Sequence, residues 1–290
     1  MILYLLLSIL SSAFLLIILR SFPIWKVETM HGIIVNYWTA ATLAFLANFE
    51  ENRQNLHLIA DFWYVTLMIG FLFIVVFFIT ARTSQKSGIG AASIASKMSM
   101  VIPIGAGILL YNEGLGLQKM AGILLAFPAV ILTSRPSRNS ENAPFNWKAA
   151  GLPALLFVGA GMVDTAIKFA QFHYINDENR QLVIMSIFAS AGLFGVLRLL
   201  FEIFIQKKSV SVKSVLGGLL LGTVNYFSIF FLLKCLESPG TESSTVFALV
   251  NVGIVITSFL SGLLLFRESV DRNKIIGLGL ALLAIWILSK

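Results

Sequence analysis

Long apolar runs separated by short polar breaks dominate this chain. Ten runs of about 20 residues are each long enough to cross a bilayer as a helix. A backbone amide in lipid has no water to bond, so each run is expected to be helical. The runs are 2–19, 29–48, 62–81, 89–111, 115–134, 149–171, 180–204, 214–236, 242–266 and 272–289. The pattern predicts an all-α membrane protein with ten transmembrane helices.

The later part of the chain repeats the middle part. The sequence GILLYNE at 107–113 recurs 155 positions later as GLLLFRE at 262–268, and Gly122 falls on Gly277 at the same offset. Further upstream, the match continues at an offset of 152. Many secondary transporters are built from two copies of one membrane unit, so the repeat carries functional information.

A polar linker with two prolines divides the runs into two sets of five. We therefore expect a first five-helix repeat at 1–134, a linker at 135–148 and a second five-helix repeat at 149–290. Five is an odd number, so the two copies must enter the membrane from opposite sides. The expected fold is two inverted five-helix repeats.

The composition excludes several classes of protein. Apolar residues make up 58% of the chain and charged residues 12%, about half the share in soluble proteins. The spans leave no room for a soluble catalytic domain, and the single Cys235 rules out an intrachain disulfide. The net charge of +7 is scattered over short loops, with no phosphate loop, zinc spacing or basic-aromatic patch. We expect no enzyme, no cofactor, no metal and no nucleic-acid partner.

The motif around the repeated glutamate resembles a known family. L-L-Y-N-E-x5-K-x2-G-I-L-L-A in the first half and L-L-F-R-E-x5-K-x2-G-L-G-L-A in the second are similar to the EamA-type branch of the drug/metabolite transporter superfamily. The resemblance implies a secondary transporter, often an exporter of small organic metabolites, with a central cavity between the halves. Relatives also often carry a proline in helices 4 and 9; here Pro103 lies in the fourth span and the ninth has none.

The orientation in the membrane stays open. Thirteen Lys and Arg residues fall on the side without the termini and five on the side with them, which puts the termini outside by the positive-inside rule. The family resemblance implies that both termini are cytoplasmic. The five are Arg53, Lys119, Arg180, Lys234 and Lys290.

Two charged residues lie well inside predicted spans, where each costs about 2.5–3.5 kcal/mol on insertion scales. Asp164 either pairs with Lys168 on its own helix or forms an acidic site for a proton or a substrate amine. Lys97 either reaches toward the interface or meets a substrate carboxylate or phosphate. Its counterparts in the second copy are Leu249 or Val252, so the charge is absent from the shared scaffold. This difference favours a role in substrate binding.

Neutral polar residues form a second set of candidates. An Asn side chain has four hydrogen-bonding positions that lipid cannot satisfy. These residues either bond to a neighbouring helix or line a polar cavity, and we expect Asn225 and Asn251 to face one cavity with Lys97. The set is Asn36, Thr39, Asn225, Tyr226 and Asn251.

Glu113 and Glu268 end matching helices in the two copies. A carboxylate is unfavourable at a helix C-terminus, so its presence in both copies is better explained if it caps the following helix. We interpret this pair, with Gly122 and Gly277, as a structural repeat motif.

The leading hypothesis is a carrier of small organic metabolites, multi-pass in the cell membrane with lipid around it. The alternative is a non-transporting membrane scaffold or sensor, which the charges in mid-membrane disfavour. The chain has no pair of acidic residues in adjacent spans that would support an intramembrane enzyme, and its histidines lie at span ends or in loops. The oligomeric state is left open, a homodimer included.

Overall fold

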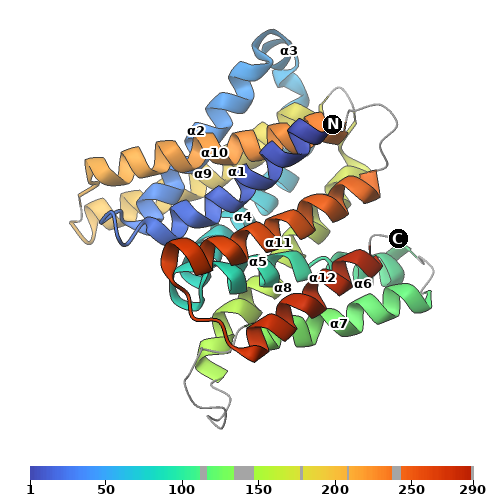
Figure 1. The fold of residues 1–290 in the computed structure, drawn as a ribbon. Coiled ribbons are helices and arrows are strands. Elements are labelled where there is room, and N and C mark those ends of the chain that lie inside the picture. The colour runs from blue at the N-terminus through green and yellow to red at the C-terminus, as the bar shows by residue number, and fades with distance from the viewer. Residues whose placement is uncertain (112–115, 134–146, 177–178, 208, 237–242, 289–290) are drawn as a thin grey trace. The chain divides into compact units, whose positions relative to one another are not determined.

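The structure is a computed structural model that describes residues 1–111, 116–133, 147–176, 179–207, 209–236 and 243–288. Over these residues the chain is helical and contains no strand (Figure 1). The helices are α1 (Ile2–Ser21), α2 (Thr29–Ala47), α3 (Phe49–Gln54), the 3-10 turn η1 (Leu56–Leu58), α4 (Ile59–Ser87), α5 (Ile89–Met98), α6 (Val101–Tyr111), α7 (Leu117–Thr133), α8 (Trp147–His173), α9 (Arg180–Phe204), α10 (Val212–Leu236), α11 (Ser243–Phe266) and α12 (Arg272–Leu288).

Eight helical segments among the described residues are long and apolar enough to cross a membrane. This confirms an all-helical, multi-pass membrane protein. Helices also form at the other two expected spans, where α7 and α12 have 17 described residues each, at the lower limit of the spanning length. The count of ten spans is therefore not confirmed.

The fourth expected span is interrupted, where the pattern predicts one helix over 89–111. Helix α5 ends at Met98 and α6 begins at Val101. Pro103 has no amide proton, and its ring collides with the carbonyl of the residue four positions earlier, which is Ser99. That carbonyl instead accepts from the amide of Ile102 over 2.9 Å, in a tighter turn. In the second half, α11 has no proline and runs without interruption from Ser243 to Phe266.

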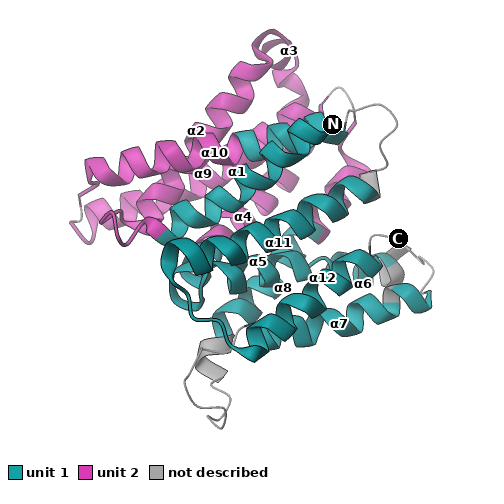
Figure 2. Ribbon diagram, in the orientation of Figure 1, with its two compact units in different colours: residues 1–20, 79–164, 227–290 teal, residues 21–78, 165–226 magenta. Residues whose placement is uncertain are grey.

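The chain divides into two compact units, each built from separate parts of the sequence (Figure 2). Unit 1 joins residues 1–20, 79–164 and 227–290, and unit 2 joins 21–78 and 165–226. Each expected half of the chain therefore contributes in the same order, first to unit 1, then to unit 2 and then to unit 1 again.

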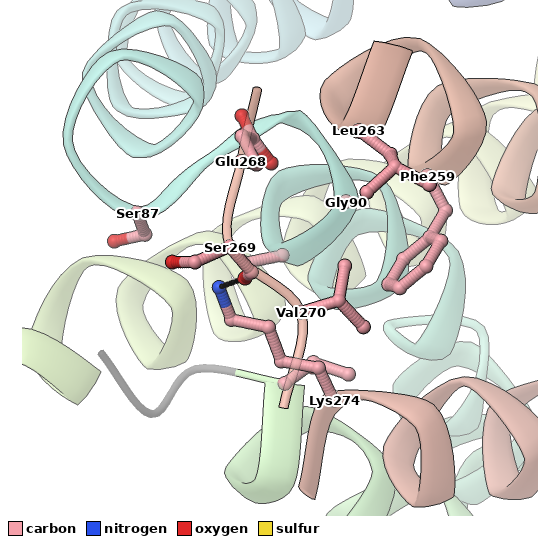
Figure 3. A pocket seen from close by; sticks show the side chains of 10 residues that line it. Ser87, Gly90, Phe259, Leu263, Glu268, Ser269, Val270 and Lys274 are labelled. Carbon is pink, nitrogen blue, oxygen red and sulfur yellow. Dashed lines mark hydrogen bonds between the residues drawn. The ribbon is translucent and has the colours of Figure 1, made fainter. Parts of the chain in front are cut away.

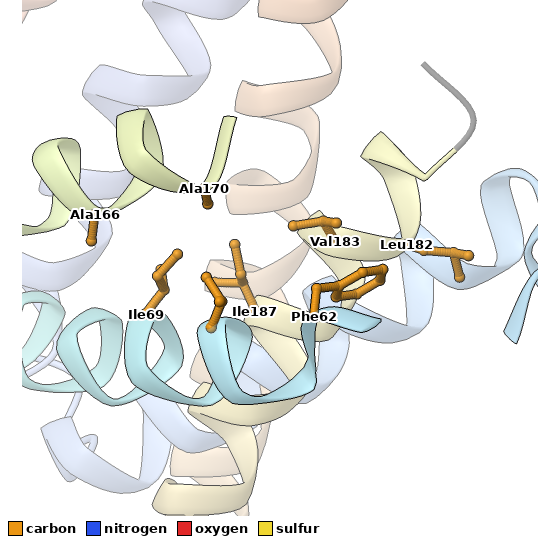
Figure 4. Packing of buried hydrophobic residues seen from close by; sticks show 8 residues of the cluster. Phe62, Ile69, Ala166, Ala170, Leu182, Val183 and Ile187 are labelled. Carbon is orange, nitrogen blue, oxygen red and sulfur yellow. The ribbon is translucent and has the colours of Figure 1, made fainter. Parts of the chain in front are cut away.

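In unit 2, a buried apolar cluster holds α4, α8 and α9 together (Figure 4). Lipid is as apolar as these side chains, so close packing rather than escape from water stabilises the contact. The cluster consists of Phe62, Val65, Ile69, Ala166, Ala170, Leu182, Val183 and Ile187.

Two glycines let α10 approach α2 in the same unit. A Cβ atom at Gly218 would lie 2.6 Å from the carbonyl oxygen of Gly32, and one at Gly222 would lie 2.6 Å from that of Asn36. Small residues at this spacing permit backbone contact between membrane helices. Gly218 and Gly222 are therefore packing positions.

In unit 1, α5 packs against α11 and α7 against α12. Gly122 of α7 lies against Leu288, and Gly277 of α12 lies against Thr133. At the repeat offset of 155, Gly122 corresponds to Gly277 and Thr133 to Leu288. Each contact therefore joins the same two repeat positions, once in each direction.

Candidate functional site

The interruption between α5 and α6 brings two charged side chains and a hydroxyl group together in unit 1. Lys97 lies in the last turn of α5, where a cation complements the helix dipole. Ser99, directly after the helix, donates from Oγ to Asp164 Oδ2 of α8 over 3.2 Å. Lys97 and Asp164 also interact electrostatically. Sequence reasoning had singled out both charges but had not paired them.

The hydroxyl group of Ser99 has two competing acceptors. Its Oγ lies 2.5 Å from the carbonyl oxygen of Ser96 and 3.2 Å from Asp164 Oδ2, but it carries a single proton. The Asp164 carboxylate therefore keeps capacity for another donor. Its side chain is exposed, while that of Lys97 is half-buried. The site can offer an ammonium group to an anion and a carboxylate to a cation or hydrogen-bond donor.

In unit 2, two of the predicted polar residues bond to each other. Asn225 Nδ2 of α10 donates to Asn36 Oδ1 of α2 over 3.1 Å, and both side chains are buried. Asn36 Nδ2 is buried with no hydrogen-bond partner among the described residues. Thr39 donates to the carbonyl oxygen of Val35 within its own helix. Asn36 and Asn225 thus form an interhelical contact, which was one of the two expected arrangements.

The other polar candidates are half-buried. Tyr226 of α10 ends unit 2, and Asn251 of α11 lies in unit 1. The candidates therefore fall into two groups: Lys97, Asp164 and Asn251 in unit 1, and Asn36, Thr39, Asn225 and Tyr226 in unit 2. The common cavity for Lys97, Asn225 and Asn251 stays a prediction.

Glu268 caps a helix, but a different one from the helix expected. Its Oε1 accepts from the amide of Ile89, the first residue of α5, over 2.9 Å. The next helix, α12, is instead capped by Asp271, whose Oδ1 accepts from the amide of Lys274 over 2.9 Å. Gly88, with φ of 101°, makes room for the carboxylate, because a Cβ atom there would lie 2.5 Å from Glu268 Oε2. Glu113 lies outside the described residues.

A small, open hollow lies beside this cap in unit 1 (Figure 3). Its two charged side chains are already engaged, since Glu268 caps α5 and Lys274 Nζ donates to the carbonyl oxygen of Ser269 over 2.8 Å. The hollow is lined by Ser87, Gly90, Ala91, Thr133, Phe259, Leu263, Glu268, Ser269, Val270 and Lys274. It does not include Lys97 or Asp164, which remain the better ligand-binding candidates.

Sequence reasoning missed an ionic cluster around the buried Glu202 in unit 2. His31 Nε2 lies 3.0 Å from Glu202 Oε2, and Glu202 Oε1 accepts from Arg198 Nε over 2.9 Å. The histidine had been set aside because it lies at a span end. The spacing of Arg198 and Glu202, four residues apart on one helix, was the available signal.

No family model matches the chain. It is 27% identical over 225 residues to an uncharacterized protein of Haemophilus influenzae, and the match covers 77% of this chain and 74% of that protein. A protein of similar sequence therefore occurs in that bacterium.

Proposed function

We propose that this chain is a secondary transporter that exports small organic metabolites across the cell membrane by alternating access. The observation that carries the proposal is the interrupted span with Lys97, Ser99 and Asp164 beside the interruption. Transporters commonly bind substrate where a membrane helix is broken, because free backbone groups and helix ends there face the ligand. Charges within a span are costly and mark substrate or ion paths.

The proposed architecture is that of the EamA-type branch of the drug/metabolite transporter superfamily, with ten spans in two inverted repeats. Two observations support it. The halves contribute to the two units in the same order, and α7 and α12 touch through reciprocal contacts at Gly122 and Gly277. In this proposal α7 and α12 also cross the membrane. A transporter of this type needs no resident cofactor and catalyses no reaction.

The substrate class follows from the charges at the site. Lys97 favours a carboxylate or phosphate group, and Asp164 favours an amine or a hydrogen-bond donor. The proposed substrates are therefore anionic or zwitterionic metabolites.

Transport from loaded vesicles tests the proposal. The purified protein is reconstituted into liposomes that contain a defined mixture of anionic, zwitterionic, cationic and neutral metabolites, and loss from the vesicles is followed by mass spectrometry. Faster loss of an anionic or zwitterionic compound than from protein-free liposomes supports the proposal. If no compound leaves faster, with and without a pH gradient, the transport function is wrong. Loss of cations alone overturns the substrate class.

A further inference from the structure

The N-terminal turn of α2 holds a histidine that is almost completely enclosed by protein. His31 is 3% exposed, and Glu202, near the C-terminal end of α9, is 4% exposed. Glu202 Oε1 accepts two bonds from Arg198, at 2.9 Å from Nε and 2.8 Å from the terminal nitrogen. Those bonds keep the carboxylate ionised, so its Oε2 acts as an acceptor. His31 Nε2 must then carry a hydrogen and donate to it over 3.0 Å.

This bond determines which nitrogen is free in the neutral imidazole ring. With the hydrogen on Nε2, the lone pair is on Nδ1. That atom is buried with no hydrogen-bond partner among the described residues, and it lies 3.8 Å from Glu28 Oε2. Glu28 is the N-cap of α2, and its side chain is 45% exposed, so it connects the ring to water.

The charges around the neutral ring are not balanced. Glu28 and Glu202 carry two negative charges and Arg198 one positive charge, so a neutral ring leaves the group at net −1. Protonation of the ring brings the net charge to zero, so that the buried Glu202 carboxylate lies between two cations. From α10, Ser214 accepts a bond from the Glu28 amide over 3.0 Å and Gly218 contacts Gly32; neither is charged. The neighbouring Lys213 is exposed.

We propose that His31 is a proton-binding site of this protein. A proton from water passes by way of the Glu28 carboxylate to Nδ1, and Glu28 is left ionised beside the imidazolium. The protonated ring then joins Glu28 to Glu202 and ties the first turn of α2 to the end of α9. The site does not depend on the proposed transport function, because every group belongs to unit 2 and no substrate takes part.

Nitrogen NMR of the full-length protein, labelled with ¹⁵N-histidine, tests the site without any substrate. At about pH 8.5 the ring of His31 should show a protonated Nε2 and a bare Nδ1, and at about pH 5 both nitrogens should be protonated. The other two histidines are internal controls, since Nδ1 of His57 and of His173 lies 3.1 and 3.0 Å from a backbone carbonyl oxygen and favours the opposite tautomer. Replacement of His31 by Gln identifies its signals. If that variant does not fold, His57→Gln and His173→Gln identify them by elimination.

Hydrogen exchange tests whether the protonated ring stabilises the contact between α2 and α9. Between about pH 8.5 and about pH 5, after correction for intrinsic rates, protection of amides in the first turns of α2 should rise roughly 1.5- to fivefold, as expected for one half-exposed ion pair. Glu28→Gln keeps a capping oxygen but removes the charge, and should abolish the rise. Three results would overturn the proposal: a protonated Nδ1 at high pH, the same protonation state of the ring at both pH values, or an equal rise in amide protection in Glu28→Gln. Failure of vesicle transport would leave it intact.

Discussion

Single charged residues in the apolar spans carry most of the functional information in this chain. Lys97 and Asp164 could be recognised from the sequence because a charge in lipid needs a reason. Their pairing could not, since they lie on different helices and depend on how α5 and α8 approach each other. The bond from Ser99 to Asp164 also required coordinates.

Replacement of Lys97 by Met should lower export of an anionic metabolite roughly ten- to hundredfold, the loss expected for one charge-assisted hydrogen bond. Asp164 then lacks its opposite charge, so the melting temperature should also fall. In the double variant Lys97→Met with Asp164→Asn, the melting temperature should recover while transport stays low. Vesicle transport and melting curves of all three proteins measure this. Wild-type transport in Lys97→Met would show that the charge does not bind the substrate.

At the scale of elements, helix ends and helix contacts depend on residues far away in the sequence. The positions of most helices follow from the apolar runs. The interruption after α5 is a local effect of Pro103, and the sequence contained that signal. The sequence predicted that the Glu268 carboxylate caps the following helix. That prediction was wrong, because the motif shows that a carboxylate is present but not which amide it accepts from. Glu268 meets the amide of Ile89.

Replacement of Glu268 by Ala should lower the free energy of unfolding by about 0.5–2 kcal/mol, the usual cost of a lost N-cap. Glu268→Gln keeps an acceptor oxygen and should cost less. Glu50 is exposed in α3, so Glu50→Ala is a matched control expected to change stability by about 0.5 kcal/mol or less. Chemical unfolding in detergent gives the comparison. Equal stability of Glu268→Ala and Glu50→Ala would contradict the capping role.

Replacement of Gly222 by Ala should destabilise the contact between α10 and α2 by about 1–3 kcal/mol, because the new methyl group collides with backbone atoms that cannot move aside. Gly279 of α12 has no atom within 4 Å of an added Cβ, so Gly279→Ala is the control. It should leave stability unchanged or raise it, since Ala favours the helix more than Gly. Thermal unfolding of both variants tests this. A Gly222→Ala protein as stable as Gly279→Ala would show that the two helices can separate without cost.

For the whole molecule, the repeat indicated where the halves meet in sequence but not how they combine. The apolar periodicity does not show which helices belong to the same unit. Each compact unit takes segments from both halves, so neither half contains a complete unit. The division into two five-helix repeats stays a prediction, and the compact units follow a different division of the chain.

Fragments 1–134 and 135–290, expressed separately, should be degraded or aggregate, because each lacks parts of both units. Expressed together, they should assemble and purify as a pair. Affinity purification through a tag on one fragment, followed by detection of the other, measures this. A fragment that is monodisperse on its own would contradict the shared construction of the units.

The cap on α5 also has a consequence for the timing of synthesis. Glu268 follows Ile89 by 179 positions. At a translation rate of about 5–20 residues per second, α5 is in place roughly 9–36 s before the carboxylate that completes it has been made. During that interval its first amides must be satisfied by water or lipid headgroups. Ribosome pausing or truncation late in the gene would therefore leave a defect at the start of a helix synthesised much earlier.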